Sequence, residues 1–119
     1  MFLYGGFSSP EDEPGLVYTY NTQNGVWSIP NVRRDNNNTR KRSLEAVSDY
    51  NGQIYLFGGS SDKLDASNDM LILDTINLVW KAGSSANAPS VRFYYGATLL
   101  PNQTIIYFGM FILIIQPFI

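Results

Sequence analysis

The chemistry open to this 119-residue chain is limited by its composition, because it contains neither cysteine nor histidine. Thiol and imidazole nucleophiles, histidine bases and the usual zinc and copper ligands are therefore excluded. Three aspartates, Asp62, Asp65 and Asp69, lack the spacing and the glycine of a calcium-binding loop, so we interpret them as solvated turn residues. No catalytic residue, metal ligand or cofactor site is predicted.

Basic residues gather in one short stretch of the sequence. It contains Arg33, Arg34, Arg40, Lys41 and Arg42, interrupted by the polar residues 35–39. Such a stretch can bind an acidic peptide or a phosphate, or serve as a nuclear-import signal. The alternative interpretation is a long solvated loop.

The overall charge argues against several classes of partner. The formal net charge is −2 and the isoelectric point is about 4.8, so no nucleic-acid partner is expected. The N-terminus lacks the basic and sustained apolar regions of a signal peptide, and without cysteine there is no disulfide framework. The compartment is not fixed by these features, although a cytoplasmic location is favoured over secretion.

The elements that must position these residues are predicted to be β-strands, because the chain is rich in Tyr and Phe between turn-forming residues. An internal repeat supports this. Residues 2–6 (FLYGG) return as 55–59 (YLFGG) and, imperfectly, as 106–110 (IYFGM). At the offset of the first two copies, residues 17–22 correspond to 70–75 and Trp27 corresponds to Trp80.

One copy of the repeat shows four short strands. We predict them at residues 44–49, 53–57, 69–73 and 78–82, with turns at 50–52 and 74–77. Several of these strands are continuously apolar, which is expected where both faces of a sheet are covered. The glycine pair at 58–59 suits a strand end that needs positive φ or a close approach by another segment.

The motifs IYLFGG at 54–59, LDT at 73–75 and Trp80 resemble the kelch repeat, whose period is about 50 residues. The chain departs from the family pattern at Ile72 and Leu73, where tyrosine is common, and at Met110, which replaces a glycine. The resemblance implies a partial β-propeller of four-stranded antiparallel blades. Trp27 and Trp80 are expected to fill the space between blades rather than to stack on a ligand.

The repeat divides the chain into one complete and two incomplete blades. We expect a partial blade with strands two to four at 1–29, an inter-blade loop at 30–43, a complete blade at 44–82 and a partial blade with strands one and two at 83–109. Closed propellers have roughly four to eight blades. The chain is therefore expected to be a fragment of a larger propeller, or an open assembly with exposed apolar edges.

The apolar tail at 110–119 has no counterpart in the repeat. The uncharged apolar run 105–115 is shorter than the roughly 20 residues of a membrane-spanning helix. A membrane partner is expected only through this tail, and the alternative is a stray end of a truncated reading frame. Two N-glycosylation patterns, at Asn37 and Asn102, are informative only if the chain is secreted.

The resemblance implies a function in recognition. In kelch proteins the strands are scaffold, and partners are held by the loops, here 7–15, 30–43, 60–68 and 83–93. We therefore expect a non-catalytic scaffold that binds a protein or peptide. Arg42 and Arg92 are expected at equivalent places in successive copies, and the candidate partner-binding residues are Arg33, Arg34, Arg42, Arg92, Asp62 and Lys63.

Two alternatives remain open at this stage. One is a piece of an oxidase of the galactose-oxidase type, whose copper ligands would have to come from elsewhere, because this chain lacks His and Cys. The other is an extracellular, membrane-tethered propeller.

Overall fold

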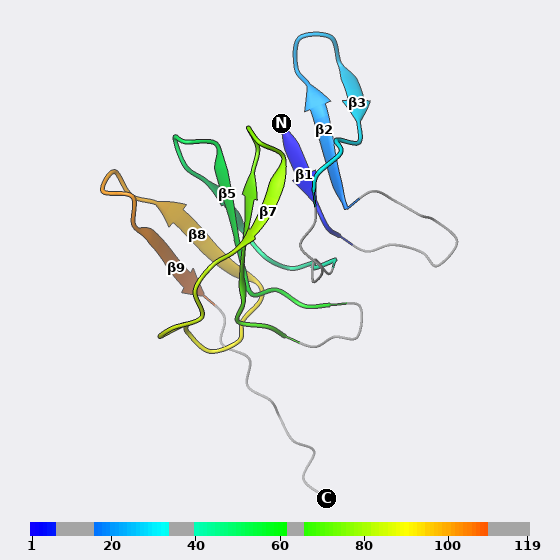
Figure 1. Ribbon diagram of the computed structural model, residues 1–119. Helices are drawn as coiled ribbons and strands as arrows, with labels where there is room; N and C mark the ends of the chain where they lie inside the picture. Colours follow the sequence, from blue (N-terminus) through cyan, green and yellow to red (C-terminus); the bar gives the residue numbers. More distant parts are fainter. Residues whose placement is uncertain (7–15, 34–39, 62–65, 110–119) are drawn as a thin grey trace, which may run out of the picture.

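The computed structural model describes residues 1–6, 16–33, 40–61 and 66–109, which form β-strands joined by turns and loops (Figure 1). Their nine strands make three antiparallel sheets of three, four and two strands. None of the described residues is helical, so none belongs to an apolar helix of membrane-spanning length. The fold is all-β, which confirms the predicted class.

The middle sheet consists of four strands that follow one another in sequence and in space. They are β4 (Ala46–Ser48), β5 (Gln53–Phe57), β6 (Met70–Asp74) and β7 (Val79–Ala82). The first strand is shorter than predicted, because β4 pairs with β5 only from Ala46 to Ser48. Leu44, expected in that strand, packs instead against the core.

The incomplete sheets lie on opposite sides of the middle sheet (Figure 1). One contains β1 (Phe2–Tyr4), β2 (Val17–Asn21) and β3 (Val26–Ser28). The other is the hairpin of β8 (Tyr95–Leu99) and β9 (Ile105–Gly109). The arrangement has one complete and two incomplete four-stranded units, as the repeat predicts.

The core lies between the first and middle sheets and contains Leu16, Val17, Leu56, Leu71, Leu73 and Trp80. Trp80 packs edge-on against Tyr4 of β1, with ring centroids 5.4 Å apart. On the other side of the middle sheet, Phe57 packs against Tyr95 and Tyr107. The expectation that both tryptophans fill space between sheets holds for Trp80. It is wrong for Trp27, which is exposed and packs against the ring of Tyr20 in its own sheet.

The glycine pairs join each sheet to the segment that leads into the next one. Gly58 and Gly59 have φ values of 67° and 81°. A Cβ on Gly58 would lie 2.6 Å from the carbonyl oxygen of Arg92, and the N–H of Gly59 donates to that same oxygen at 2.9 Å. Gly5 and Gly6 make the corresponding contacts with Lys41. Positive φ and close approach, both expected from sequence, occur together.

Candidate functional site

A cleft of about 430 Å³ lies at the junction of the middle sheet and the β8–β9 sheet. It is lined by Arg42, Ser43, Ser60, Phe93 and Tyr94. All five residues belong to segments that lead into a first strand or out of β5. The loops at this end of the sheets therefore form the walls, and the strands fix where those loops start.

Backbone hydrogen bonds hold the cleft walls together. Arg42 and Ser60 exchange two of them, each 3.0 Å long, in an isolated antiparallel bridge. The N–H of Tyr94 donates to the carbonyl of Ser43 at 2.8 Å. Ser43 and Tyr94 have φ values of 60° and 53°, so the chain turns sharply at both positions. The rings of Phe93 and Tyr94 meet edge to face at 5.0 Å.

The chemistry of this lining suits a polar chain segment with an acidic group. Arg42 contributes a guanidinium, which forms charge-assisted hydrogen bonds with carboxylates and phosphates. The hydroxyls of Ser43 and Ser60 can donate or accept. The two aromatic rings offer apolar surface for neighbouring side chains.

The structure separates the three predicted site residues that it describes, Arg33, Arg42 and Arg92. Arg42 lines the cleft, whereas exposed Arg33 lies beside the edge strand β7, where its N–H donates to Leu78 at 2.9 Å. The guanidinium of Arg92 donates to the carbonyl and hydroxyl oxygens of Ser90, both at 3.3 Å. Arg34, Asp62 and Lys63 lie outside the described residues, as do the tail 110–119 and the acceptor pattern at Asn37.

The expected equivalence of Arg42 and Arg92 is wrong by one residue. The carbonyl of Lys41 accepts from Gly6 as that of Arg92 accepts from Gly59, so Lys41 and Arg92 correspond. Ser43 and Tyr94, two positions further on in each copy, share positive φ. Arg42 therefore corresponds to Phe93, and both line the cleft.

Lys41 serves the fold rather than the cleft. Its side chain is buried, and its ammonium lies 2.5 Å from a carboxylate oxygen of Asp69. Burial would raise the pKa of Asp69, but hydrogen bonds from Lys41 and Ser67 lower it below its usual value. Burial, and then the charge of Asp69, raise the pKa of Tyr4, whose hydroxyl is hydrogen-bonded to the Lys41 backbone.

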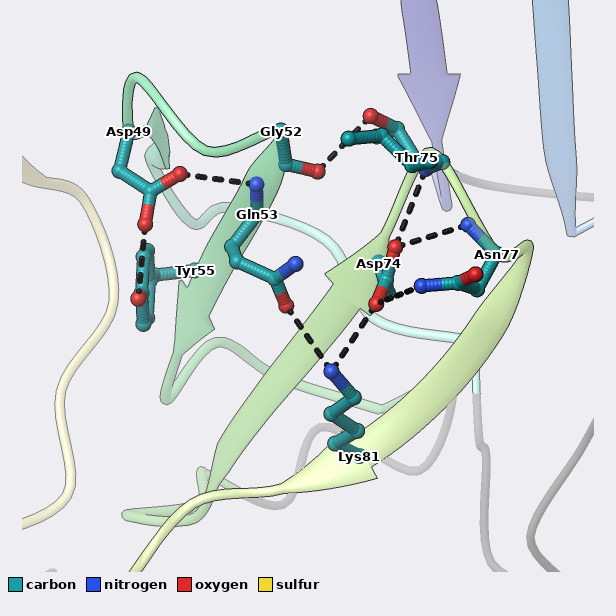
Figure 2. Close-up of polar contacts among 9 residues, drawn as sticks. Asp49, Gly52, Gln53, Tyr55, Asp74, Thr75, Asn77 and Lys81 are labelled. Atoms are coloured by element: carbon teal, nitrogen blue, oxygen red, sulfur yellow. Dashed lines mark hydrogen bonds and ion pairs between the residues drawn. The ribbon is translucent and has the colours of Figure 1, made fainter.

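A second polar cluster lies at the opposite ends of β5 and β6, beside the tight turns (Figure 2). Asp74 accepts from the side chain and the N–H of Asn77, at 3.0 and 2.9 Å, and from Lys81 at 2.9 Å. These contacts hold its pKa far below the usual range. Asp49 accepts from the N–H groups of Asn51 and Gln53. The partners of these carboxylates come from the turns and from the strands that leave them, so the cluster stabilises the turns and the strand ends beside them.

Sequence reasoning missed Ser43, Ser60, Phe93 and Tyr94 as cleft residues. The signal was present in part, because Ser60 directly follows the glycine pair and Phe93 and Tyr94 directly precede a predicted strand. Their convergence depends on how the two sheets pack, which local patterns do not encode.

Comparison with known proteins agrees with the repeated sheets and their glycine-pair junctions. Residues 1–112 match the family described as KLHDC2/KLHL20/DRC7 Kelch-repeats domain. The chain belongs to the kelch-repeat family. Its sheets are kelch blades, one complete and two incomplete, and together they form part of a kelch propeller.

Curated kelch proteins resemble the chain along most of its length. Kelch domain-containing protein 3 of Rattus norvegicus and that of Mus musculus are each 30% identical over 112 residues, which cover 92% of this chain. The Bos taurus protein of the same name is 27% identical over 111 residues. The chain spans 28% of the length of these relatives.

Proposed function

We propose that this kelch chain is a non-catalytic binding module that holds an acidic segment of a protein or peptide partner. The segment docks in the cleft between the middle blade and the β8–β9 blade. The observation that carries the proposal is the convergence of Arg42, two serines and two aromatic rings on one hollow of about 430 Å³.

The position of the cleft supports binding. Binding residues concentrate on loops held by a rigid framework, and these loops are joined to one another by backbone hydrogen bonds at the strand ends. The overall charge is −2, so an acidic partner is not drawn to the chain by its net charge. Recognition of such a partner then depends on local groups, of which Arg42 is the cation in the cleft lining.

The non-catalytic part of the proposal rests on how the acidic groups are used. Asp69 is paired with Lys41, and Asp74 with Asn77 and Lys81. Among residues 1–6, 16–33, 40–61 and 66–109, no three acidic side chains are grouped so that they could hold a metal ion. These carboxylates support turns and inter-blade packing.

The test uses a fluorescein-labelled peptide of alternating glutamate and leucine, with a lysine and leucine peptide of equal length as the comparison. Fluorescence anisotropy measures binding to the wild type and to the Arg42→Ala variant. We expect the acidic peptide to bind more tightly, and Arg42→Ala to weaken it by about tenfold or more, the loss expected for one charge-assisted hydrogen bond.

Arg33→Ala is the matched control, because it removes one positive charge from an exposed site outside the cleft lining. It should leave the affinity for the acidic peptide within about twofold, since surface charges contribute little individually. Equal weakening by both substitutions would show that net charge governs binding, and the cleft proposal would then fail.

A further inference from the structure

The chain contains two Asn-Gly pairs, and both lie in hairpin turns. Asn51 and Gly52 lie between β4 and β5, and Asn24 and Gly25 lie between β2 and β3. Asparagine is a chemically labile residue, and a following glycine exposes its backbone nitrogen to the asparagine side chain because it has no Cβ. Both asparagines are exposed to water, so a difference between the two pairs must come from their hydrogen bonds.

The β2–β3 turn holds both reacting groups of the Asn24 pair. The N–H of Gly25 donates to the carbonyl of Asn21 at 2.8 Å. The side-chain oxygen of Asn24 accepts from the N–H of Val26 at 3.1 Å. The nitrogen of Gly25 can therefore reach the side-chain amide of Asn24 only after these hydrogen bonds break.

The β4–β5 turn leaves the corresponding groups of the Asn51 pair unheld. The carboxylate of Asp49 accepts from the N–H groups of Asn51 and Gln53, both at 2.9 Å, and so fixes the backbone on each side of Gly52 (Figure 2). Within the part of the chain that the structure describes, neither the N–H of Gly52 nor the side chain of Asn51 has a hydrogen-bond partner. Nothing there has to break before the two groups meet.

We propose that Asn51 is a site of spontaneous deamidation and that the fold protects Asn24 from the same reaction. The backbone nitrogen of Gly52 gives its proton to water and attacks Cγ of Asn51. The N–Cγ bond forms, the Cγ–Nδ2 bond breaks and ammonia leaves, which produces a cyclic imide. Water then opens the imide at one of its two carbonyls, and the product at position 51 is aspartate or isoaspartate.

The isoaspartate product alters the contact between the two turns at this end of the middle blade. The carbonyl of Gly52 accepts from the N–H and the hydroxyl of Thr75, at 2.9 and 2.8 Å (Figure 2). Isoaspartate routes the main chain through the side-chain carbon and lengthens it by one methylene, which displaces Gly52 from Thr75. We expect the modified chain to unfold at a lower urea concentration than the fresh chain.

The test incubates the folded full chain at mildly alkaline pH and follows both pairs by mass spectrometry after a short digestion with trypsin. Cleavage after Lys and Arg places Asn51 in the peptide 43–63 and Asn24 in the peptide 1–33, so the two sites are read separately. We expect Asn51 to react about fivefold faster than Asn24 or more, the factor that corresponds to one hydrogen bond that must break first. Labelling by an isoaspartyl methyltransferase identifies the isoaspartate product.

Two comparisons separate the effect of the fold from that of the local sequence. In urea, where the turns are unfolded, the two pairs should react at similar rates. Asn51→Gln should abolish the reaction at this position and the loss of stability on incubation, because a glutamine side chain is one methylene too long for the same ring. Asn24→Gln is the matched control and should leave the rate at Asn51 unchanged.

Three results would overturn the proposal. They are equal rates for the two pairs in the folded chain, faster reaction at Asn24, and a preference for Asn51 that persists unchanged in urea. The last result would mean that the neighbouring residues, and not the hydrogen bonds of the turns, select the site.

Discussion

The turn between β6 and β7 shows how one side chain specifies a local structure in this chain. An oxygen of Asp74 accepts from the N–H groups of Ile76 and Asn77, at 3.1 and 2.9 Å. In the first blade, the side-chain oxygen of Asn21 takes the equivalent place. It accepts from the N–H groups of Gln23 and Asn24, at 2.8 and 3.3 Å. Both side chains make this turn, so the charge of Asp74 is not needed for the turn itself.

The charge of Asp74 matters first through the hydrogen bonds from Asn77 and then through Lys81. Lys81 stands opposite Ile72, where the first blade has Ser28 opposite Thr19. Because the folded state lowers the pKa of Asp74, the stabilisation is complete above the unfolded pKa of about 3.9 and is lost as the pH falls below it. We expect Asp74→Asn to keep the turn and to reduce the loss of stability between about pH 5 and pH 2. Urea unfolding at a series of pH values measures this.

Asn21→Asp provides the matched control for the Asp74 prediction. It places a carboxylate in the equivalent turn, where two backbone N–H groups donate to residue 21 but no lysine lies on the facing strand, so the acid dependence that it adds should be smaller than the part that Asp74 contributes. Parallel pH profiles for wild type and Asp74→Asn would contradict the assigned role of the Asp74 charge.

At the scale of elements, the strands and turns were predictable because the repeat places the same signals in each copy. The run Gln53–Phe57 was predicted with its observed bounds, since Asn51 and Gly52 begin it and a glycine pair ends it. The place of Arg92 in the repeat was not predicted correctly, because loop residues carry no strong local signal. The offset that relates Gly58 to Gly109 would have paired Lys41, not Arg42, with Arg92.

The glycine pairs provide a prediction for this scale. Gly58 and Gly6 both have positive φ, but an added Cβ would lie 2.6 Å from the Arg92 carbonyl at Gly58 and meets nothing within 4 Å at Gly6. Gly6→Ala should cost about 1 kcal/mol of unfolding free energy, the strain of a left-handed alanine. Gly58→Ala should cost about 3 kcal/mol or more, because the segment leading into β8 must also move.

Urea titrations followed by circular dichroism compare these two glycine variants under identical conditions. Equal destabilisation would mean that backbone strain alone decides the cost. The contact between Gly58 and Arg92 would then have no role in joining the two blades.

At the scale of the whole molecule, blade packing decides what the sequence pattern leaves open. Trp27 and Trp80 have the same place in the repeat, yet one is exposed and the other buried, because the first blade covers Trp80 whereas no blade among the described residues covers Trp27. The cleft likewise exists only where two blades meet, which is why Arg42 was a candidate but its neighbours were not. Patterns within one repeat specify a blade, whereas burial and the site depend on neighbouring blades.

The ion pair of Lys41 and Asp69 tests how the blades are held together. Lys41 lies in the segment between blades, contacts Tyr4 of the first blade through its backbone, and bonds Asp69 beside β6 through its side chain. The Lys41 side chain is 4% exposed and that of Asp69 is 50% exposed. The two partners therefore differ in what their removal leaves behind.

Removing Asp69 leaves a buried ammonium without its carboxylate, whereas removing the charge of Lys41 leaves an aspartate that water can reach. We expect Asp69→Ala to cost about 2–4 kcal/mol and Lys41→Met, which keeps the buried chain length, to cost about 1 kcal/mol or less. Urea unfolding at pH 7 measures both, and the double variant should be more stable than Asp69→Ala alone. A larger loss of unfolding free energy for Lys41→Met than for Asp69→Ala would contradict this expectation. It would mean that the ion pair holds the blades together and that burial of the lysine stem does not.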